Sequence, residues 1–396
     1  MTDQRVAIAG VGQTTIWPRG QSAPLTEIDL TCQALTSACA DAGIPVTDVD
    51  GFAFYRGGVD AGLLAQTLGI KEITFCASLS GAGGGSAGTL GLAAAAIRSG
   101  MATVVACPMA FQQIGTRFGA AYARDGVGGG PLYNHAAPED DFLRPADLVA
   151  PAQMFALITQ RHMHKYGTTR EAFAEVATTF RDNARKTPGS LMTKPMTRDD
   201  YFNARMISDP ICLYDCCVES EGAGVVLVTS LERARDLRPT PVEVLASVHG
   251  GEGDWGQGIM WLNMPDEIFS SSGHRGVARR MYERAGITPA DVDVAMIYDH
   301  FSPMVLLQLE DYGFCGVGES NDFVLDGNIR MDGAIPVNPN GGQLSNGYLI
   351  GFSLVTEAVR QVRGEGANQV PGAEVALVTG GPAALPVSGS LLGAVR

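Results

Sequence analysis

Short, continuous apolar runs alternate along the chain with longer segments of helical periodicity. The apolar runs cover residues 5–12, 51–55, 102–107, 222–229, 294–298 and 375–379. Runs of this length are typical of strands that are buried on both faces of a sheet. Helices are expected over about 24–42, 61–68, 150–166, 169–187 and 352–363. Strands and helices in this alternation predict an α/β fold.

The glycines after the first apolar run invite a dinucleotide-binding interpretation. Gly10 and Gly12 have the spacing G-x-G, but the third glycine of the fingerprint is missing. The residues that follow, 14–20, contain Pro18 and do not open a helix, as the fingerprint would require. The sequence therefore argues against a nucleotide site at this turn.

One string of residues occurs twice, and its two copies organise the chain. Residues 42–50 (AGIPVTDVD) recur as residues 285–293 (AGITPADVD), each time after a helix and before an apolar strand. Further along, each copy has a glycine-rich turn, at 81–86 and at 340–347, followed by a helix and a strand. A repeat of this length indicates a duplicated half-domain rather than a solenoid.

A segment of different texture, about residues 111–206, lies between the repeated parts. It contains a glycine-rich loop at 125–131 and a strong helix pair, in which the hydroxyl of Thr169 is expected to cap the second helix. We interpret this segment as an insertion in the first half. The predicted halves are then residues 1–235, with the insertion, and residues 236–396.

Charge and hydropathy exclude several classes of function. The 396 residues carry a formal net charge of −14, which disfavours binding to phosphate backbones. The densest basic stretch, residues 161–185, also holds three acidic residues and is expected to be a solvated helical face. No apolar run is long enough to span a membrane, and the first residues lack the features of a signal peptide. The sequence therefore predicts a cytoplasmic protein that binds neither nucleic acid nor membrane.

Cysteine and histidine spacing gives no sign of a disulfide framework or a zinc site. The chain has eight cysteines and no C-x-x-C string. The vicinal pair Cys216-Cys217 is expected to pack rather than to serve redox or metal chemistry. His162 and His164 are two residues apart on a predicted helix, so they point to different faces and make a poor metal pair.

Three strings resemble one branch of the thiolase superfamily: residues 164–171 (HKYGTTRE), 207–216 (ISDPICLYDC) and 337–347 (VNPNGGQLSNG). This branch is named for the thiolase part of sterol carrier protein X and is often called lipid-transfer protein. The resemblance covers nearly the whole chain. It implies a five-layered α/β thiolase fold of two similar halves, a helical loop insertion, and a homodimer formed through the first half.

The positions where thiolases carry catalytic side chains depart from the thiolase pattern. The place of the nucleophilic cysteine falls on Gly83, and no cysteine lies between residues 77 and 106. Tyr348 stands where thiolases have the histidine of a glycine-histidine-proline motif, and the cysteine expected beside Val378 is absent. Because an acyl-enzyme needs a nucleophile, ordinary Claisen condensation and thiolysis are not expected.

The thiolase-like aldolases that shorten steroid side chains share these departures. The resemblance implies retro-aldol cleavage of a β-hydroxyacyl-CoA to a C17 ketone of the steroid nucleus and a short acyl-CoA such as propionyl-CoA. It also implies a small zinc-ribbon/OB-fold partner protein that is fused to or associated with a hydratase. No cofactor or metal is expected on this chain, because CoA is part of the substrate and any zinc belongs to the partner.

Retro-aldol cleavage needs a base for the alcohol proton, an acid for the departing carbon and a place for the enolate. The catalytic candidates are Tyr348 and Tyr298, with either one as the base and the other as the acid. Asp299 and His300 are expected to tune these tyrosines or to hold a water. For His300, packing beside Phe301 is the alternative.

Glycines are the candidates for binding the substrate and the developing oxyanion: Gly83, Gly347, Gly380 and Gly381. Gly83 is expected to offer a backbone N–H at the N-terminus of its helix, where the dipole favours negative charge. Close packing of helix on strand is the alternative for these glycines. The large apolar residues of 255–264 are expected either to line a wide pocket or to pack at an interface.

Two other classes of function remain as alternatives to the lyase. One is a thiolase-type acyltransferase, which would consume or release free CoA. The other is a non-catalytic homologue that binds an acyl-CoA or a sterol without turning it over.

Overall fold

Strands from both parts of the chain form one ten-stranded sheet in the computed structural model, which describes residues 4–55, 59–79, 83–113, 117, 145, 147–148, 150–237, 240–252, 269–383 and 386–395. The earlier strands are β1 (Val6–Gln13), β2 (Trp17–Pro18), β3 (Gly51–Tyr55), β4 (Phe75–Leu79), β5 (Val104–Phe111) and β8 (Ser220–Ser230). The later strands are β9 (Val242–Gly250), β10 (Val294–Met296), β11 (Val375–Gly380) and β12 (Val387–Ala394). A separate pair consists of β6 (Met206–Ser208) and β7 (Ile211–Cys212).

The sheet contains the same strand arrangement twice. In the first half β5 is parallel to β3 and antiparallel to β8, which is antiparallel to β1. In the second half β11 is parallel to β10 and antiparallel to β12, which is antiparallel to β9. In the first half the outer strand β4 pairs with β3. At the corresponding place in the second half, the described residues show a single parallel bridge between Ala295 and Val337. The halves join where β1 pairs with β9, and the predicted duplication is confirmed.

The repeated sequence string makes the same contacts in both halves. It begins at the ends of α1 (Glu27–Ala42) and α10 (Arg275–Ala285), which both stop at a glycine in the left-handed conformation. Its last residue, Asp50, accepts hydrogen bonds from two backbone N–H groups where β5 begins, at 2.8–3.0 Å. Asp293 does the same where β11 begins, at 2.8 and 2.9 Å. The string therefore ties one strand to its parallel neighbour in each half.

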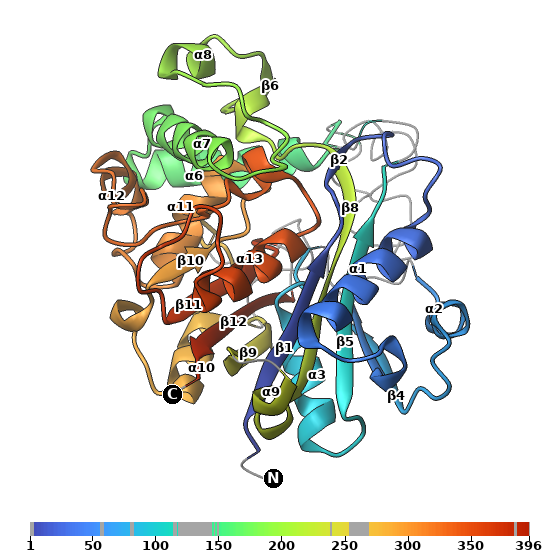
Figure 1. Cartoon of the computed structure of the whole chain (residues 1–396). Coiled ribbons are helices and arrows are strands. Elements are labelled where there is room, and N and C mark those ends of the chain that lie inside the picture. The colour runs from blue at the N-terminus through green and yellow to red at the C-terminus, as the bar shows by residue number, and fades with distance from the viewer. Residues whose placement is uncertain are drawn as a thin grey trace.

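Helices between and outside the two halves complete the layers (Figure 1). The central helices α3 (Gly88–Arg98) and α13 (Phe352–Arg363) each contact strands of both halves. Helix α1 packs on the outer face of β1, β5 and β8, and α10 packs on β9 and β12. Apolar side chains of the central helices, such as Leu90 and Phe352, are fully buried. This is the predicted five-layered thiolase arrangement.

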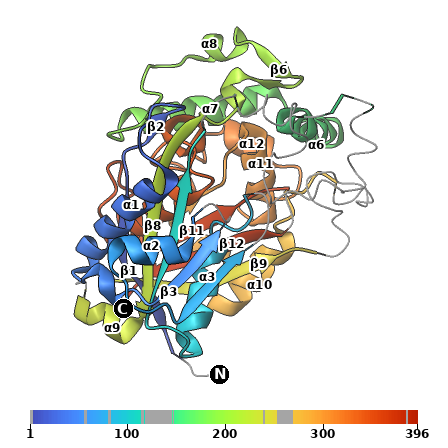
Figure 2. The ribbon, with the colours of Figure 1, turned by 90° about the vertical axis from the view of Figure 1, so that its right-hand side faces the viewer.

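In the part of the chain that the structure describes, the remaining α-helices are α2 (Ala61–Leu68), α6 (Pro151–Tyr166), α7 (Arg170–Arg185), α8 (Arg198–Phe202), α9 (Leu231–Leu237), α11 (Ser302–Asp311) and α12 (Ser320–Leu325). Helices α6, α7 and α8 belong to the predicted insertion and gather at one end of the molecule in both views (Figures 1 and 2). The predicted boundary between residues 235 and 236 falls within α9 and stays a prediction. The predicted segments 125–131 and 255–264 lie outside the described residues. Within the described ranges, no helix combines the length and apolar composition needed to cross a bilayer.

Helix α7 is more buried than its charged sequence predicts. Glu175, Arg181 and Asn183 are only 3%, 4% and 3% exposed, so the expectation of a solvated face is wrong for this part of the stretch. The physical reason is that α11, α12 and a segment of the second half cover α7, and its polar side chains find partners there. Glu175 accepts from Arg198 at 2.7 Å and from the Arg330 Nε at 2.8 Å. The insertion is thus anchored on the second half.

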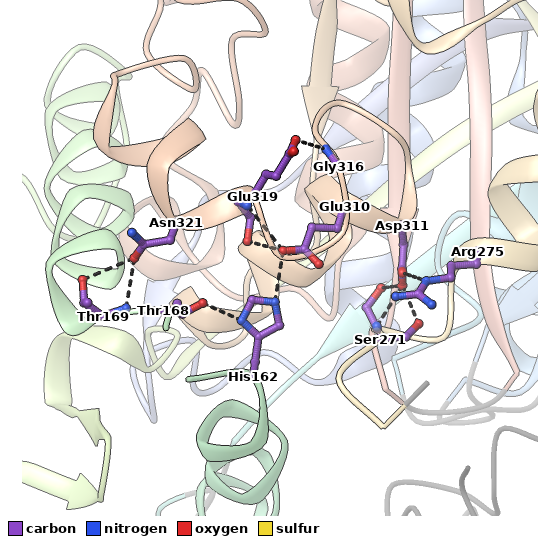
Figure 3. A network of polar contacts seen from close by, with 12 residues as sticks. His162, Thr168, Thr169, Ser271, Arg275, Glu310, Asp311, Gly316, Glu319 and Asn321 are labelled. Atoms are coloured by element: carbon purple, nitrogen blue, oxygen red, sulfur yellow. Dashed lines mark hydrogen bonds and ion pairs between the residues drawn. The ribbon is translucent and has the colours of Figure 1, made fainter. Parts of the chain in front are cut away.

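Two neighbouring carboxylates at the end of α11 have different partners: Glu310 strengthens this anchoring, and Asp311 binds within the second half (Figure 3). Glu310 lies 3.0 Å from Nε2 of His162 on α6, and Nδ1 of the same ring lies 2.7 Å from the Thr168 hydroxyl. Asp311 accepts from the Arg275 Nε at 2.8 Å, where α10 begins. Both nitrogens of His162 are therefore engaged inside the protein.

We predict that Asp50→Ala and Asp293→Ala each lower the free energy of unfolding by about 1 kcal/mol, because each removes the acceptor of two backbone N–H groups. Urea unfolding measures the effect. Asp182→Ala is the control, since this exposed partner of Arg185 is expected to contribute at most about 0.5 kcal/mol. Losses no larger than in the control would contradict the role given to the repeated aspartates.

Candidate active site

Two tyrosine hydroxyls meet between the halves. Tyr298 follows β10, and Tyr348 lies between the π-helix η5 (Gly342–Asn346) and α13. Their phenolic oxygens are 3.2 Å apart. Both residues are buried, with Tyr298 only 2% and Tyr348 only 8% exposed. The structure therefore brings together the two tyrosines that the sequence singled out, within hydrogen-bonding distance.

Hydrogen bonds fix the backbone of Tyr298. Its N–H donates to the Thr379 hydroxyl oxygen at 2.8 Å, and its carbonyl accepts from Nε2 of Gln308 at 2.8 Å. The Thr379 hydroxyl in turn donates to Oε1 of Gln308 at 2.6 Å, which closes a ring of contacts. Asn338 holds the preceding residue, Ile297, by two side-chain bonds of 2.8 Å. These partners leave little freedom in the direction of the Tyr298 ring.

The first half holds Tyr348, although this tyrosine belongs to the second half. The hydroxyl of Ser220, on β8, accepts from the Tyr348 N–H at 2.7 Å and donates to its carbonyl at 2.9 Å. The ring of Phe111, at the end of β5, meets the Tyr348 ring edge-on with centroids 5.5 Å apart. The position of Tyr348 therefore depends on both halves.

The Gly83 turn approaches the tyrosines from the first half. A Cβ atom on Gly83 would lie 2.8 Å from the Tyr298 hydroxyl oxygen, and one on Gly381 would lie 2.4 Å from the Gly83 carbonyl carbon. Real Cβ atoms do not occur so close to other atoms, so side chains are excluded from both positions. Gly83 also has φ +91°, which favours glycine.

The expected helix N-terminus at Gly83 is wrong by five residues. Helix α3 begins at Gly88, because residues 83–87 form a turn before the helix. The Gly83 N–H donates to the hydroxyl of Tyr55. This N–H is therefore already engaged, whereas the sequence interpretation offered it to the substrate.

Of the other two candidate glycines, Gly380 lies against this turn and Gly347 lies in the loop of Tyr348. A Cβ on Gly380 would lie 2.6 Å from the hydroxyl oxygen of Ser86, and the Gly380 carbonyl lies 3.3 Å from Nε2 of the buried His274. Gly347 precedes Tyr348, but its N–H donates to the Gly342 carbonyl at 3.3 Å. The N–H of Gly347 is thus used within its own loop.

Asp299 serves the loop that carries Tyr348. Its two carboxylate oxygens accept the N–H groups of Gln343 and Leu344, at 2.9 and 3.1 Å, where η5 begins. The side chain is fully buried. Burial raises the pKa of Asp299 to about 7, although the hydrogen bonds from these N–H groups oppose the rise. The carboxyl group therefore titrates near neutrality inside the protein.

His300 contacts the ring of Tyr298 and the inserted helix α6. Its ring lies edge-on to Tyr298 and to Phe155, with centroid distances of 5.3 and 4.3 Å. Its Nδ1 is buried and has no hydrogen-bond partner among the described residues. Burial lowers the pKa of His300 to about 3, so the ring is neutral at physiological pH. An unsatisfied buried nitrogen is costly, and such atoms gather at functional sites.

No cysteine is prepared to act as a nucleophile. All eight cysteines are free, and burial is the first cause of a raised pKa in every one of them. A thiol with a raised pKa holds little thiolate at neutral pH. Among the described residues, no group of three or more His, Cys, Asp or Glu could hold a metal ion. Acid–base chemistry by oxygen groups is what this arrangement offers.

Sequence reasoning missed three side chains that shape the site: Tyr55, Phe111 and Ser220. A signal existed for Tyr55, because it ends the apolar strand after the first copy of the repeat as Tyr298 does after the second. Ser220 and Phe111 have no comparable signal. Their contacts with Tyr348 span 128 and 237 residues of sequence, which no local pattern records.

We predict that Asp299 contributes stability that is lost as pH rises from about 4 to 7, so that Asp299→Asn changes the slope of unfolding free energy against pH by up to about 1.4 kcal/mol per pH unit in this range. In this range the folded state keeps a proton on Asp299 that the unfolded state has released, so raising the pH favours unfolding. Above pH 7 both states have lost the proton and the slopes should agree. Urea unfolding at several pH values measures both proteins. Equal slopes between pH 4 and 7 would contradict the raised pKa.

Comparison with known proteins places this site in a family. Residues 259–390 match the domain family described as thiolase C-terminal domain-like. The chain is 38% identical over 395 residues to the steroid side-chain-cleaving aldolase of Thermomonospora curvata, with 98% of each chain covered. It is 37% identical over 399 residues to the 17-hydroxy-3-oxo-4-pregnene-20-carboxyl-CoA lyase of Mycobacterium tuberculosis, with 99% of this chain and 100% of the lyase covered.

Solved structures agree with these relatives. The Ltp2-ChsH2(DUF35) aldolase matches 99% of this chain and 98% of its own, at 36% identity, with a TM-score of 0.90. Human mitochondrial 3-ketoacyl-CoA thiolase in complex with CoA has a TM-score of 0.66 at 15% identity and shares the fold alone. The chain belongs to the thiolase-like family, in the group that contains these steroid side-chain-cleaving aldolases.

Proposed function

We propose that this chain is a carbon–carbon lyase that acts on acyl-CoA thioesters. The substrate is a β-hydroxyacyl-CoA that carries a steroid side chain, and retro-aldol cleavage gives a ketone on the steroid nucleus and a short acyl-CoA such as propionyl-CoA. Two relatives of nearly the same length are named as an aldolase and a lyase of such compounds. The observation that carries the proposal is the Tyr298–Tyr348 hydroxyl pair in a site without an activated thiol.

The reaction divides into two proton transfers around the breaking of one bond. A base takes the proton of the β-hydroxyl group, the electron pair of that O–H forms the ketone, and the Cα–Cβ bond breaks. The pair from the broken bond becomes the enolate of the thioester, and an acid then protonates Cα. No nucleophile is needed, which is why the loss of the thiolase cysteine is compatible with this activity.

We assign the acid role to Tyr298 and the base role to Tyr348. Burial, followed by the neighbouring Tyr348 and Tyr55, raises the pKa of Tyr298 well above its ordinary value. Tyr298 therefore stays protonated and is suited to donate. A hydrogen bond from Tyr298 to the Tyr348 oxygen stabilises negative charge on that oxygen, and so helps Tyr348 to accept the alcohol proton.

The neighbours support this pair in different ways. Asp299 orders the loop of Tyr348 through its two hydrogen bonds to η5. His300, with its unpartnered Nδ1, is proposed to hold a water or to orient the Tyr298 ring. The N–H groups of Gly83 and Gly347 have partners in the protein. Gly380 and Gly381 remain proposed backbone donors to the enolate oxygen.

A partner protein and a homodimer belong to the same proposal. One solved relative is named Ltp2-ChsH2(DUF35) aldolase, and this chain carries a net charge of −14 although CoA brings several phosphate charges. Arg and Lys residues of a small zinc-ribbon/OB-fold partner, associated with a hydratase, would supply the missing positive charge. Any zinc then belongs to the partner, and a cytoplasmic location is part of this proposal.

Product analysis tests the proposed function. The chain, with its partner, is incubated with a steroid β-hydroxyacyl-CoA in the absence of free CoA. We expect a ketone and a shortened acyl-CoA in equal amounts. A requirement for free CoA would instead indicate an acyltransferase, and unchanged substrate with measurable binding would indicate a non-catalytic homologue.

We predict that Tyr348→Phe lowers the rate of cleavage by about 10²-fold or more, because general acid–base groups contribute on this scale. The substitution keeps the ring and its contact with Phe111, so the thermal midpoint should change little. Tyr214→Phe is the control, since this partly buried tyrosine lies beneath Arg181. Near-wild-type cleavage by a folded Tyr348→Phe protein would remove Tyr348 from the mechanism.

A further inference from the structure

The duplication places a third tyrosine at the site. Tyr55 ends β3 of the first half, and Tyr298 stands at the corresponding place after β10 of the second half. Both residues are 2% exposed. A buried phenol needs a partner for its hydroxyl group, so the contacts of the two hydroxyls show what each tyrosine can do.

The two tyrosine rings are packed alike. Each lies against a glycine shortly before the central helix of its own half: Gly85 before α3 and Gly351 before α13. A Cβ on Gly85 would lie 2.2 Å from Cδ2 of Tyr55, and one on Gly351 would lie 2.7 Å from Cε2 of Tyr298. In each half, the tyrosine ring occupies the space that a side chain at the glycine position would need.

The two hydroxyl groups reach the same turn. The Tyr55 hydroxyl accepts the N–H of Gly83. The Tyr298 hydroxyl lies where a Gly83 side chain would begin, 2.8 Å from the position of its Cβ, and is bonded to Tyr348. Gly83 thus sits between a tyrosine of each half, with its backbone held by one and its open side facing the other.

We propose that Tyr55 is a positioning residue of this site, whose hydroxyl fixes the Gly83 turn against Tyr298. The inference rests on the proposed aldolase function. Within the turn, the Ser86 hydroxyl donates to the Gly83 carbonyl at 3.3 Å, and Gly381 packs against the other side of the turn, so the Tyr55 hydroxyl is the group that fixes the Gly83 N–H. Without the Tyr55 hydroxyl, the turn can shift toward or away from Tyr298 by a fraction of an ångström. Shifts of this size near the reacting atoms lower rates strongly.

The assignment also explains why the Gly83 N–H does not serve the substrate. The Gly83 N–H is bound to the Tyr55 hydroxyl. The position where thiolases carry their nucleophile therefore has a structural role in this chain and no chemical one. Tyr348 and Tyr298 then act on the substrate beside a turn whose position is fixed. A hydroxyl that only filled space could be removed without consequence, and this gives the test.

The test compares Tyr55→Phe with the control Tyr282→Phe in the complete enzyme with its partner. Tyr282 lies on α10, outside the site, and its hydroxyl donates to the Tyr312 carbonyl at 3.2 Å. We expect Tyr55→Phe to lower kcat by about 10- to 100-fold with KM within about twofold, while the control retains wild-type values. Gly85→Ala, whose Cβ would push on the Tyr55 ring, is expected to lower kcat in the same way. A kcat for Tyr55→Phe within about twofold of wild type overturns the proposal.

Amide hydrogen exchange of the peptide containing Gly83 gives a second readout that needs no substrate. We expect Gly83 to exchange at least about tenfold faster in Tyr55→Phe than in wild type or Tyr282→Phe, because its N–H has lost its acceptor. Unchanged exchange also overturns the proposal. If the wild-type enzyme cleaves no substrate, the proposed function fails, and the exchange experiment still decides whether Tyr55 holds the turn.

Discussion

The close approach of the Gly83 turn to Tyr298 is the constraint on which the site depends. The turn belongs to the first half and the tyrosine to the second, and there is no room for a side chain on Gly83 between them. Tyr348 crosses the same boundary, because Ser220 of β8 fixes its backbone. The site therefore exists only when the two copies of the strand arrangement are joined. The fold builds the site by bringing the ends of β3 and β10, with Tyr55 and Tyr298, to one place.

Burial decides which groups can do chemistry there. It raises the pKa of every cysteine, and it keeps Tyr298 protonated and His300 neutral. A buried site with two phenolic groups and no activated thiol has no strong nucleophile for the thioester, but it can hold and pass a proton between oxygens at fixed distance. This balance suits cleavage of a carbon–carbon bond whose electrons are received by the thioester itself. It does not suit the formation of an acyl-enzyme.

Much of this architecture could be predicted from the sequence, because the repeat and the buried strands leave strong local patterns. The strand 51–55 and the helices 61–68 and 352–363 have the bounds that periodicity and glycine stops predict. The pairing of Tyr298 with Tyr348 followed from family motifs on either side of them. Local patterns failed where a partner distant in sequence decides the outcome. Thr169 was expected to cap α7, but its hydroxyl donates to Asn321 at 3.3 Å instead.

Burial of polar groups is the other feature that the sequence concealed. The charges of α7 looked solvated, yet Arg181 donates to the Ser345 hydroxyl oxygen of the Tyr348 loop at 3.1 Å. Residues 340–347 are expected to form a turn, but they contain the π-helix η5. The Asp299 carboxylate holds η5 by accepting two of its backbone N–H groups. Such contacts depend on how the insertion and the halves pack. Pattern and composition alone do not encode them in readable form.

The central claim is that buried tyrosines, and no covalent nucleophile, carry the chemistry. The most direct test is the intact mass of the protein, measured in samples quenched during turnover of a steroid β-hydroxyacyl-CoA. The account predicts that the chain keeps its unmodified mass at every time point while ketone and short acyl-CoA accumulate. A transient increase in mass equal to the short acyl group would show an acyl-enzyme and would contradict the account.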